Sequence, residues 1–300
     1  MEARPALGVT IPCCLLMPEP LRLMAVLAHP DDESLGFGGT LARYAAEGVE
    51  TTLVTATRGE RGRHGVGELH PGLDALGAIR ETELRAAARE LGLREVHLLG
   101  YRDQELDRAD PREATGRIAA HLRRARPHVV ITFGPEGAYG HPDHIAICQF
   151  TTAAVLAAAG RAGERGRTPD TPDAAPGEPG DAARAPHQVA KLYYMAWGAA
   201  KWAAYQAAFK TLVSRVDGIV RQATPWPDWA ITTRIDTRAH WPTVWRAVQC
   251  HGTQLASYER LGALGHEHHA SLWGSQEFYR AFSLVNGGRE PETDLFAGLR

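Results

Sequence analysis

The chain has 300 residues, of which 44% are hydrophobic and 23% charged, a composition typical of folded globular proteins. Lys and Arg number 33 against 35 Asp and Glu, so the net charge of −2 offers no basic excess that would attract nucleic acid. No apolar run approaches the roughly 20 residues that a membrane-spanning helix needs. We therefore expect neither a nucleic-acid partner nor a membrane partner.

The N-terminus and the cysteines predict a cytoplasmic protein. Residues 1–20 contain several prolines and lack a compact basic start and a small-residue cleavage site, so we interpret them as an N-terminal extension. The cysteines, Cys13, Cys14, Cys148 and Cys250, form no CxxC pair, and free thiols in a reducing compartment fit them. The 14 histidines, several of them beside acidic residues, prompt a search for metal ligands.

Short apolar runs that alternate with amphipathic stretches predict an α/β fold. Buried strands are expected at 22–28, 51–57, 96–100, 129–133 and 192–197. Helices are expected at 39–47, 79–91 and 112–126, each followed by a glycine or proline stop signal. This order predicts a mostly parallel sheet covered on both faces, a Rossmann-like open sandwich whose core spans residues 21–158.

The second half of the chain is less regular. Residues 159–187 are rich in Gly and Pro and offer nothing to bury, so we expect a disordered surface insertion there. Residues 188–300 are expected to complete the sheet and to form a C-terminal, tryptophan-rich region that shapes the substrate cleft. The cluster His266-Glu267-His268-His269 lacks a partner cluster and is interpreted as a solvated loop rather than a second metal site.

Two clusters of histidine and acidic residues follow two predicted strands. HPDDE at 29–33 follows the first strand, and GPEGAYGHPDH at 134–144 follows the fourth. The carboxyl ends of parallel strands meet at one edge of the sheet, where open α/β folds bind ligands. Together the clusters supply two imidazoles and a carboxylate and leave positions for water and substrate, as a catalytic zinc site requires.

These motifs resemble the LmbE-like or PIG-L superfamily of N-acetylglucosaminyl deacetylases. The similarity rests on HPDDE followed by SLGFGGTL and on GAYGHPDH at 137–144. It extends to RETEL at 80–84, GYRD at 100–103 and HGTQ at 251–254, which occur in the family's order. The resemblance covers roughly residues 21 to 285 apart from the insertion, and the two histidine motifs together are specific.

The resemblance implies a single zinc ion held by His29, Asp32 and His144. It also implies that Asp31 is the general base, which takes a proton from the water that the metal activates. This chemistry suits an amide, because a bound zinc ion lowers the pKa of water to about 7 and so supplies a strong nucleophile at neutral pH. Iron(II) or another divalent ion remains an alternative to zinc, since both accept imidazole and carboxylate ligands.

The resemblance assigns roles to five further residues. His141 would stabilise the oxyanion or protonate the departing amine, Asp143 would orient a histidine, and Tyr139 matches a position that reaches the oxyanion. Arg80 and Asp103 match positions that bind sugar hydroxyls. For Arg80, an ordinary surface ion pair with Glu83, three residues along a predicted helix, is the alternative.

The sequence thus predicts a zinc-dependent N-deacetylase that acts on a small conjugate of N-acetylglucosamine and needs no cofactor beyond the metal. Two alternatives stay open: an amidase acting on a thiol conjugate or antibiotic precursor, and a nucleotide-binding α/β module without catalysis. The thiol-conjugate branch tends to carry a lysine soon after HPDDE, and residues 34–40 contain none. The aglycone and the oligomeric state, a homo-oligomer included, are left open.

Overall fold

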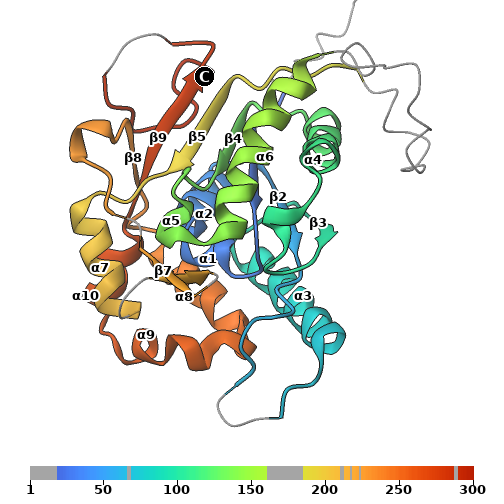
Figure 1. The fold of residues 1–300 in the computed structure, drawn as a ribbon. Helices are drawn as coiled ribbons and strands as arrows, with labels where there is room; N and C mark the ends of the chain where they lie inside the picture. The colour runs from blue at the N-terminus through green and yellow to red at the C-terminus, as the bar shows by residue number, and fades with distance from the viewer. Residues whose placement is uncertain are drawn as a thin grey trace, which may run out of the picture.

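The fold is an α/β sandwich built on a mixed, mostly parallel sheet (Figure 1). The computed structural model describes residues 19–65, 69–160, 185–209, 213–216, 218–222, 224–286 and 290–300. The strands of the main sheet lie in the order β3-β2-β1-β4-β5-β9-β8. Their bounds are β1 Arg22–Leu27, β2 Glu50–Thr57, β3 Glu95–Tyr101, β4 Val129–Thr132, β5 Lys191–Met195, β8 Thr233–Asp236 and β9 Ser275–Ser283. Strands β1 to β5 are parallel, whereas β9 runs antiparallel to both β5 and β8.

Helices cover both faces of the sheet. Helices α4 and α6 pack on each other over one face, and α2, α3 and α8 pack together over the other (Figure 1). The bounds are α1 Asp32–Leu35, α2 Gly38–Ala46, α3 Leu73–Glu90, α4 Pro111–Ala125, α5 Gly137–Gly140, α6 Pro142–Ala159, α7 Ala199–Phe209, α8 Trp241–Cys250, α9 Glu259–Ala263 and α10 His266–Trp273. A short hairpin of β6 Ser214–Val216 and β7 Ile219–Arg221 stands apart from the main sheet. None of the described helices has the length and apolar character needed to cross a bilayer.

The strand order places two loops next to each other at one edge of the sheet. Strand β1 lies between β2 and β4, and the chain runs from β1 to β2 on one side but reaches β4 only after β3. The order therefore changes direction between β1 and β4, and in open α/β sheets ligands bind in the crevice at this switch point. The two histidine motifs follow these two central strands.

The predicted α/β class is confirmed. The expected strands agree with β1 to β5 within two residues at either end, because buried parallel strands produce unbroken apolar runs. Helix α3 begins at Leu73 rather than at 79, since its first turns carry a partly exposed, weakly periodic sequence.

Two details of the second half differ from expectation. The histidine cluster at 266–269 belongs to α10 and is not a loop; His269 is buried, its Nε2 lies 2.8 Å from the oxygen of Leu261, and its ring stacks on Trp245. Residues 161–184 of the expected insertion lie outside the described residues. At its far end, His187 is buried and its Nε2 lies 2.7 Å from the oxygen of Pro127.

The C-terminal segment is fastened to the sheet by a buried ion pair and an aromatic contact. Nζ of Lys191 lies 2.7 Å from Oε1 of Glu292, and both side chains are buried. Phe296 is buried and meets the ring of Tyr44 edge to face at 5.1 Å. The last residues therefore complete the core between the sheet and α2.

We predict that Phe296→Ala lowers the free energy of unfolding by about 3 to 5 kcal/mol, because it leaves a cavity against Tyr44. Leu156→Ala serves as the control, since 62% of Leu156 is exposed, and its cost should stay within about 0.5 kcal/mol. Urea denaturation of both variants measures the difference. Equal stabilities would contradict a docked C-terminus.

Candidate metal centre and active site

Three side chains from the two loops converge at the switch point. Nδ1 of His29 lies 3.2 Å from Nε2 of His144, and Asp32 lies 3.4 Å from that Nε2 and 3.6 Å from the His29 Nδ1. All three side chains are buried. They form one of two groups of candidate metal ligands among the described residues, and the second group, His29, His141 and Asp143, also includes His29.

Local backbone structure fixes this arrangement. Asp32 begins α1, and its Oδ2 accepts hydrogen bonds from the backbone N–H groups of Ala28 (3.2 Å) and His29 (2.7 Å). His144 lies in the first turn of α6, where its ring stacks on Phe133 with centroids 3.9 Å apart. Neither side chain can turn away from the crevice without breaking these contacts.

The spacing fits a tetrahedral metal ion. With bonds of about 2.0 to 2.1 Å, two ligand atoms of such a site lie roughly 3.3 Å apart, close to the distances between His29, Asp32 and His144. Burial would raise the pKa of Asp32, but the neighbouring His144 and His29 lower it below its usual range, so this candidate ligand is an anionic carboxylate. The donor set, two imidazoles and one carboxylate, is that of open catalytic zinc sites.

The other nitrogen of His29 faces two carboxylates. Its Nε2 lies 3.1 Å from Oδ2 of Asp143 and 3.2 Å from Oδ1 of Asp103. Burial would lower the pKa of His29, but its hydrogen bonds to Asp103, Asp143 and Asp32 outweigh burial and raise it well above the usual value. A carboxylate on the second nitrogen fixes the orientation and tautomer of a metal-binding histidine, and here there are two.

Asp103 and Asp143 are themselves held by backbone amides. Oδ2 of Asp103 accepts from the N–H of Arg61 at 3.0 Å, and Asp143 accepts from the N–H groups of Gln104 (2.7 Å) and Leu106 (3.2 Å). The family resemblance implied that Asp103 binds sugar hydroxyls, which remains a prediction. Its buried contacts, however, are with His29 and a backbone amide.

Asp31 occupies a strained turn beside the three candidate ligands. Its backbone φ of 104° lies in the left-handed region, which residues other than glycine seldom adopt. This turn leads the chain into α1, which begins at the next residue, Asp32. Arg80 stabilises the turn, because one guanidinium nitrogen donates to the oxygen of Pro30 (2.5 Å) and to Oδ2 of Asp31 (3.0 Å). The other donates to the oxygen of Gly59 at 2.6 Å.

These contacts bear on the two alternatives for Arg80. A surface ion pair with Glu83 is wrong, because Arg80 is buried and Glu83 accepts instead from the N–H and hydroxyl of Thr253, both at 2.7 Å. The guanidinium of Arg80 lies at the site, but it is turned toward the Asp31 loop.

Glu33 and His251 had no predicted role, although both lie within the sequence motifs. Both are completely buried, and Oε1 of Glu33 lies 2.8 Å from Nε2 of His251 while Oε2 accepts from the N–H of Asp31 at 2.9 Å. Burial would lower the pKa of His251, but Glu33 outweighs burial and raises it. The pair therefore holds the backbone of the strained turn at Asp31, whose side chain contacts Arg80.

His251 belongs to a segment that connects three parts of the site. Thr253 binds Glu83 of α3, and Nε2 of Gln254 donates to the oxygen of Arg63 at 2.6 Å, in the loop after β2. The HGTQ motif was a signal for this segment, but its partners lie about 170 to 218 positions away along the chain. Only the folded structure shows which residues it contacts.

His141 and Tyr139 complete the ring of residues around the candidate ligands. The ring centroids of His141 lie 4.9 Å from His29 and 4.7 Å from His144. Nδ1 of His141 accepts from the N–H of Asp143 at 3.2 Å, capping α6. Burial and the neighbouring His144 and His29 lower the pKa of His141 to about 3. The ring of Tyr139 lies 5.4 Å from that of His144.

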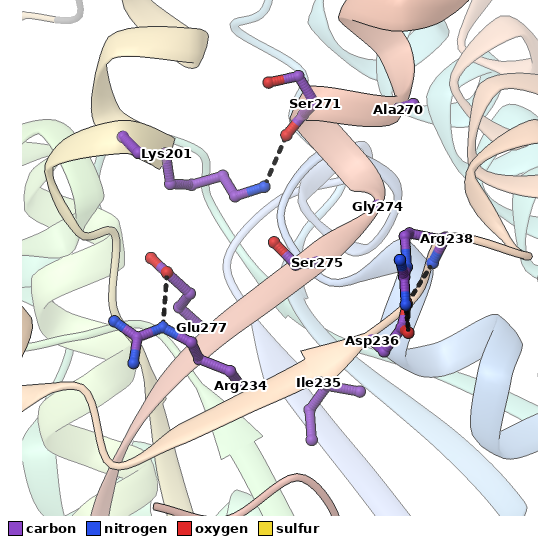
Figure 2. Close-up of a pocket in the computed structure, with 11 residues that line it drawn as sticks. Lys201, Arg234, Ile235, Asp236, Arg238, Ala270, Ser271, Gly274, Ser275 and Glu277 are labelled. Carbon is purple, nitrogen blue, oxygen red and sulfur yellow. Dashed lines mark hydrogen bonds and ion pairs between the residues drawn. The ribbon is translucent and has the colours of Figure 1, made fainter.

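Two cavities differ in their relation to this site. A cavity of about 170 Å³ adjoins it and is lined by Asp31, Asp32 and His144 together with mostly apolar residues. A cavity of about 530 Å³ lies elsewhere, between α7, β8, α10 and β9 (Figure 2).

The charged groups of the second cavity have partners within the protein. Lys201 donates to the oxygen of Ser271 at 2.8 Å, and Arg234 and Arg238 pair with Glu277 and Asp236, as Figure 2 shows. The candidate ligands Asp32 and His144 line the first cavity and not the second.

Comparison with known proteins shows the family of this chain. Residues 24–155 match the profile of the PIG-L family, described as GlcNAc-PI de-N-acetylase. A 1D-myo-inositol 2-acetamido-2-deoxy-alpha-D-glucopyranoside deacetylase from Streptomyces griseus is 36% identical over 93% of this chain and 89% of its own. The enzyme of that name from Streptomyces avermitilis is 37% identical over 93% and 97%. The chain belongs to the PIG-L, or LmbE-like, family, as the motifs predicted.

A solved structure supports the fold. A conserved protein from Thermus thermophilus superimposes with a TM-score of 0.57 at 26% identity, covering 89% of this chain and 97% of its own.

We predict that Glu33→Gln lowers the free energy of unfolding by about 3 kcal/mol below pH 6.5, because it removes the anionic partner of buried His251. The folded-state pKa of His251 is raised, so the stabilisation is fully present below the ordinary histidine pKa of 6.5 and is lost as pH rises through the folded value. The difference between wild type and variant should shrink accordingly. Urea titrations across this range measure it.

Glu95→Gln is the matched control, since that carboxylate is about half exposed beside His97 and should contribute less than about 1 kcal/mol. A difference between wild type and Glu33→Gln that grows as pH rises would contradict the assigned pair.

Proposed function

We propose that this protein is a metal-dependent N-deacetylase that removes the acetyl group from a small N-acetylglucosamine conjugate such as an N-acetylglucosaminyl inositol. The observation that carries the proposal is the buried group of His29, Asp32 and His144 beside the carboxylate of Asp31, in a chain aligned with deacetylases over nearly its whole length. The predicted enzyme class is confirmed by these relatives.

His29, Asp32 and His144 would hold the metal ion, which we take to be zinc. A divalent ion at this position supplies an acidified water and polarises the amide carbonyl. Asp31 would act as general base, because it lines the cavity shared with Asp32 and His144. Its contacts with Arg80 and Glu33 keep the turn that presents it in one conformation.

His141 would donate a hydrogen bond to the oxyanion. Its Nδ1 accepts from the backbone N–H of Asp143, so the proton of the neutral ring resides on Nε2. Its low pKa favours this neutral form, which is a donor without carrying a charge. Such a donor contributes about 2.7 to 4 kcal/mol to transition-state stabilisation. Tyr139 would be a second donor on the same side.

Asp143 would orient His29 and so tune the metal ligand, a role that its 3.1 Å contact supports. For Asp103 we propose the same orienting function in addition to substrate binding, because its Oδ1 faces the same nitrogen. Arg80 would position Asp31 and, through that loop, the substrate. The partner is then a small molecule, and the free thiols of Cys148 and Cys250 support a cytoplasmic location.

Acetate release tests the proposal. The purified protein, loaded with zinc, should release stoichiometric acetate and free amine from N-acetylglucosaminyl inositol. A parallel reaction tests the amidase alternative. Its substrate is a thiol conjugate in which the same amine forms the amide, and cleavage of that amide is measured. Turnover of the thiol conjugate alone would overturn the deacetylase assignment.

We predict that chelation abolishes turnover and that a divalent ion restores it, because three protein ligands leave an open, exchangeable site. Dialysis against a chelator, followed by titration with Zn²⁺ and with Fe²⁺ under anaerobic conditions, measures the recovery. Full activity in rigorously metal-free protein would disprove the metal-dependent mechanism.

We predict that substitution by asparagine has different effects at the neighbouring Asp31 and Asp32. Asp32→Asn removes the anionic ligand, so metal affinity should fall. Asp31→Asn removes only the proton acceptor, so the protein should bind about one metal ion while kcat drops by roughly 10² to 10⁴. Metal content by mass spectrometry and kcat for each variant separate the two roles. Loss of metal from Asp31→Asn with retention in Asp32→Asn would reverse the assignment.

A further inference from the structure

An apolar cavity opens directly from the proposed metal centre. It shares Asp31, Asp32 and His144 with that centre, and its remaining wall is mainly Leu35, Phe133, Met195, Trp197, Tyr205 and Phe209. Its volume of about 170 Å³ exceeds what the methyl group of an acetyl substrate would fill. When an acetyl substrate is bound, much of this cavity would therefore stay unfilled.

The aromatic wall is held in place before any ligand binds. Trp197 and Tyr205 stack with centroids 4.2 Å apart, and Tyr205 is buried. The hydroxyl of Tyr205 donates to the oxygen of Leu35 at 2.5 Å, and Nε1 of Trp273 donates to the same oxygen at 3.2 Å. Since these contacts occupy that carbonyl, the wall presents mainly carbon atoms to the cavity.

Gly36 lines the cavity close to Met195. Its φ of −95° and ψ of −33° are ordinary helical values, so backbone conformation does not require glycine here. A Cβ at this position would lie 3.1 Å from Sδ of Met195, another residue of the wall, and 3.3 Å from the backbone oxygen of Asp32. A larger side chain at residue 36 would therefore push Met195 and reshape the wall of the cavity.

The chemistry of the wall indicates which part of a substrate enters. Sugar and inositol hydroxyls lose hydrogen bonds when they are buried against carbon, so the polar part of the conjugate is excluded. The acyl chain is apolar and is bonded directly to the reacting carbonyl carbon, which must lie beside His144 and Asp32. An unbranched acyl chain therefore extends into the cavity from the site of reaction.

We infer that this apolar cavity is an acyl-chain subsite and that the enzyme hydrolyses N-acyl glucosamine conjugates with chains longer than acetyl. The inference rests on the proposed function. In the reaction, the oxygen of water bonds to the acyl carbon, the C–N bond breaks, and both protons of the water end on the departing nitrogen. The products are a short-chain carboxylate and the amino sugar conjugate in its ammonium form, with no oxidant or reductant needed.

A series of N-acyl glucosaminyl inositols tests the subsite in zinc-loaded protein. Acetyl, propionyl and butyryl substrates are compared by release of the free amine. We expect kcat/KM to rise about threefold to fourfold for each added methylene, the effect of burying one CH₂ group. A fall at each added methylene, with acetyl still cleaved, would overturn the subsite and leave the proposed function intact. Failure to cleave even the acetyl substrate would overturn both.

Substitutions at Gly36 test whether the preference for longer acyl chains arises in this cavity. Gly36→Val should lower the ratio of butyryl to acetyl kcat/KM at least tenfold, and Gly36→Ala, which adds only one methyl group, should lower it less. The matched control is Gly116→Val, because residue 116 lies in α4 with open space around it, and the ratio should stay unchanged. An unchanged ratio in a folded, zinc-binding Gly36 variant would show that acyl chains bind elsewhere.

Discussion

His29 makes the contacts on which the rest of the site depends. One nitrogen of its buried ring faces His144 and Asp32, and the other faces Asp103 and Asp143. Three carboxylates around one imidazole concentrate negative charge in a region shielded from water. Such a cluster is stable only with compensating positive charge, which a bound divalent ion or a protonated His29 supplies. A divalent ion held by His29, Asp32 and His144 would therefore meet the charge balance that this cluster requires.

The sheet provides the rigidity that this requirement needs. His29 follows β1 and His144 follows β4, and pairing of these two strands fixes the distance between the loops. Asp103 arrives from the end of β3, so three of the parallel strands deliver residues to one point. Backbone strain at Asp31 is tolerated because Arg80 and Glu33 both form hydrogen bonds with the turn.

The C-terminal region contributes to the site through its contacts with the loops and with α3. His251 supports Glu33, Thr253 fixes the helix that carries Arg80, and Trp197 with Tyr205 walls the apolar cavity. The two halves of the chain thus have different parts in the site: the parallel sheet places the candidate ligands, and the later segments support the turn at Asp31 and line the apolar cavity.

The sequence predicted the parts of the site that local pattern encodes. The apolar runs that stop just before the motifs at 29–33 and 134–144 identify two strand ends. In a parallel sheet these ends lie at the same edge, so the two motifs come together there. It could not predict the pairing of Glu33 with His251, which are 218 positions apart, or the burial of Arg80 against a backbone turn. The helix at 266–273 was missed because a run of histidines is typical of solvated loops, whereas stacking on tryptophan stabilises it here.

Anomalous diffraction at the zinc edge tests the central claim most directly. Crystals of the zinc-loaded protein should show one strong peak, about 2.0 to 2.1 Å from Nδ1 of His29 and from Nε2 of His144 and about 2.0 to 2.2 Å from a carboxylate oxygen of Asp32. Absence of a peak at these residues, or a single peak elsewhere in the molecule, would contradict the account.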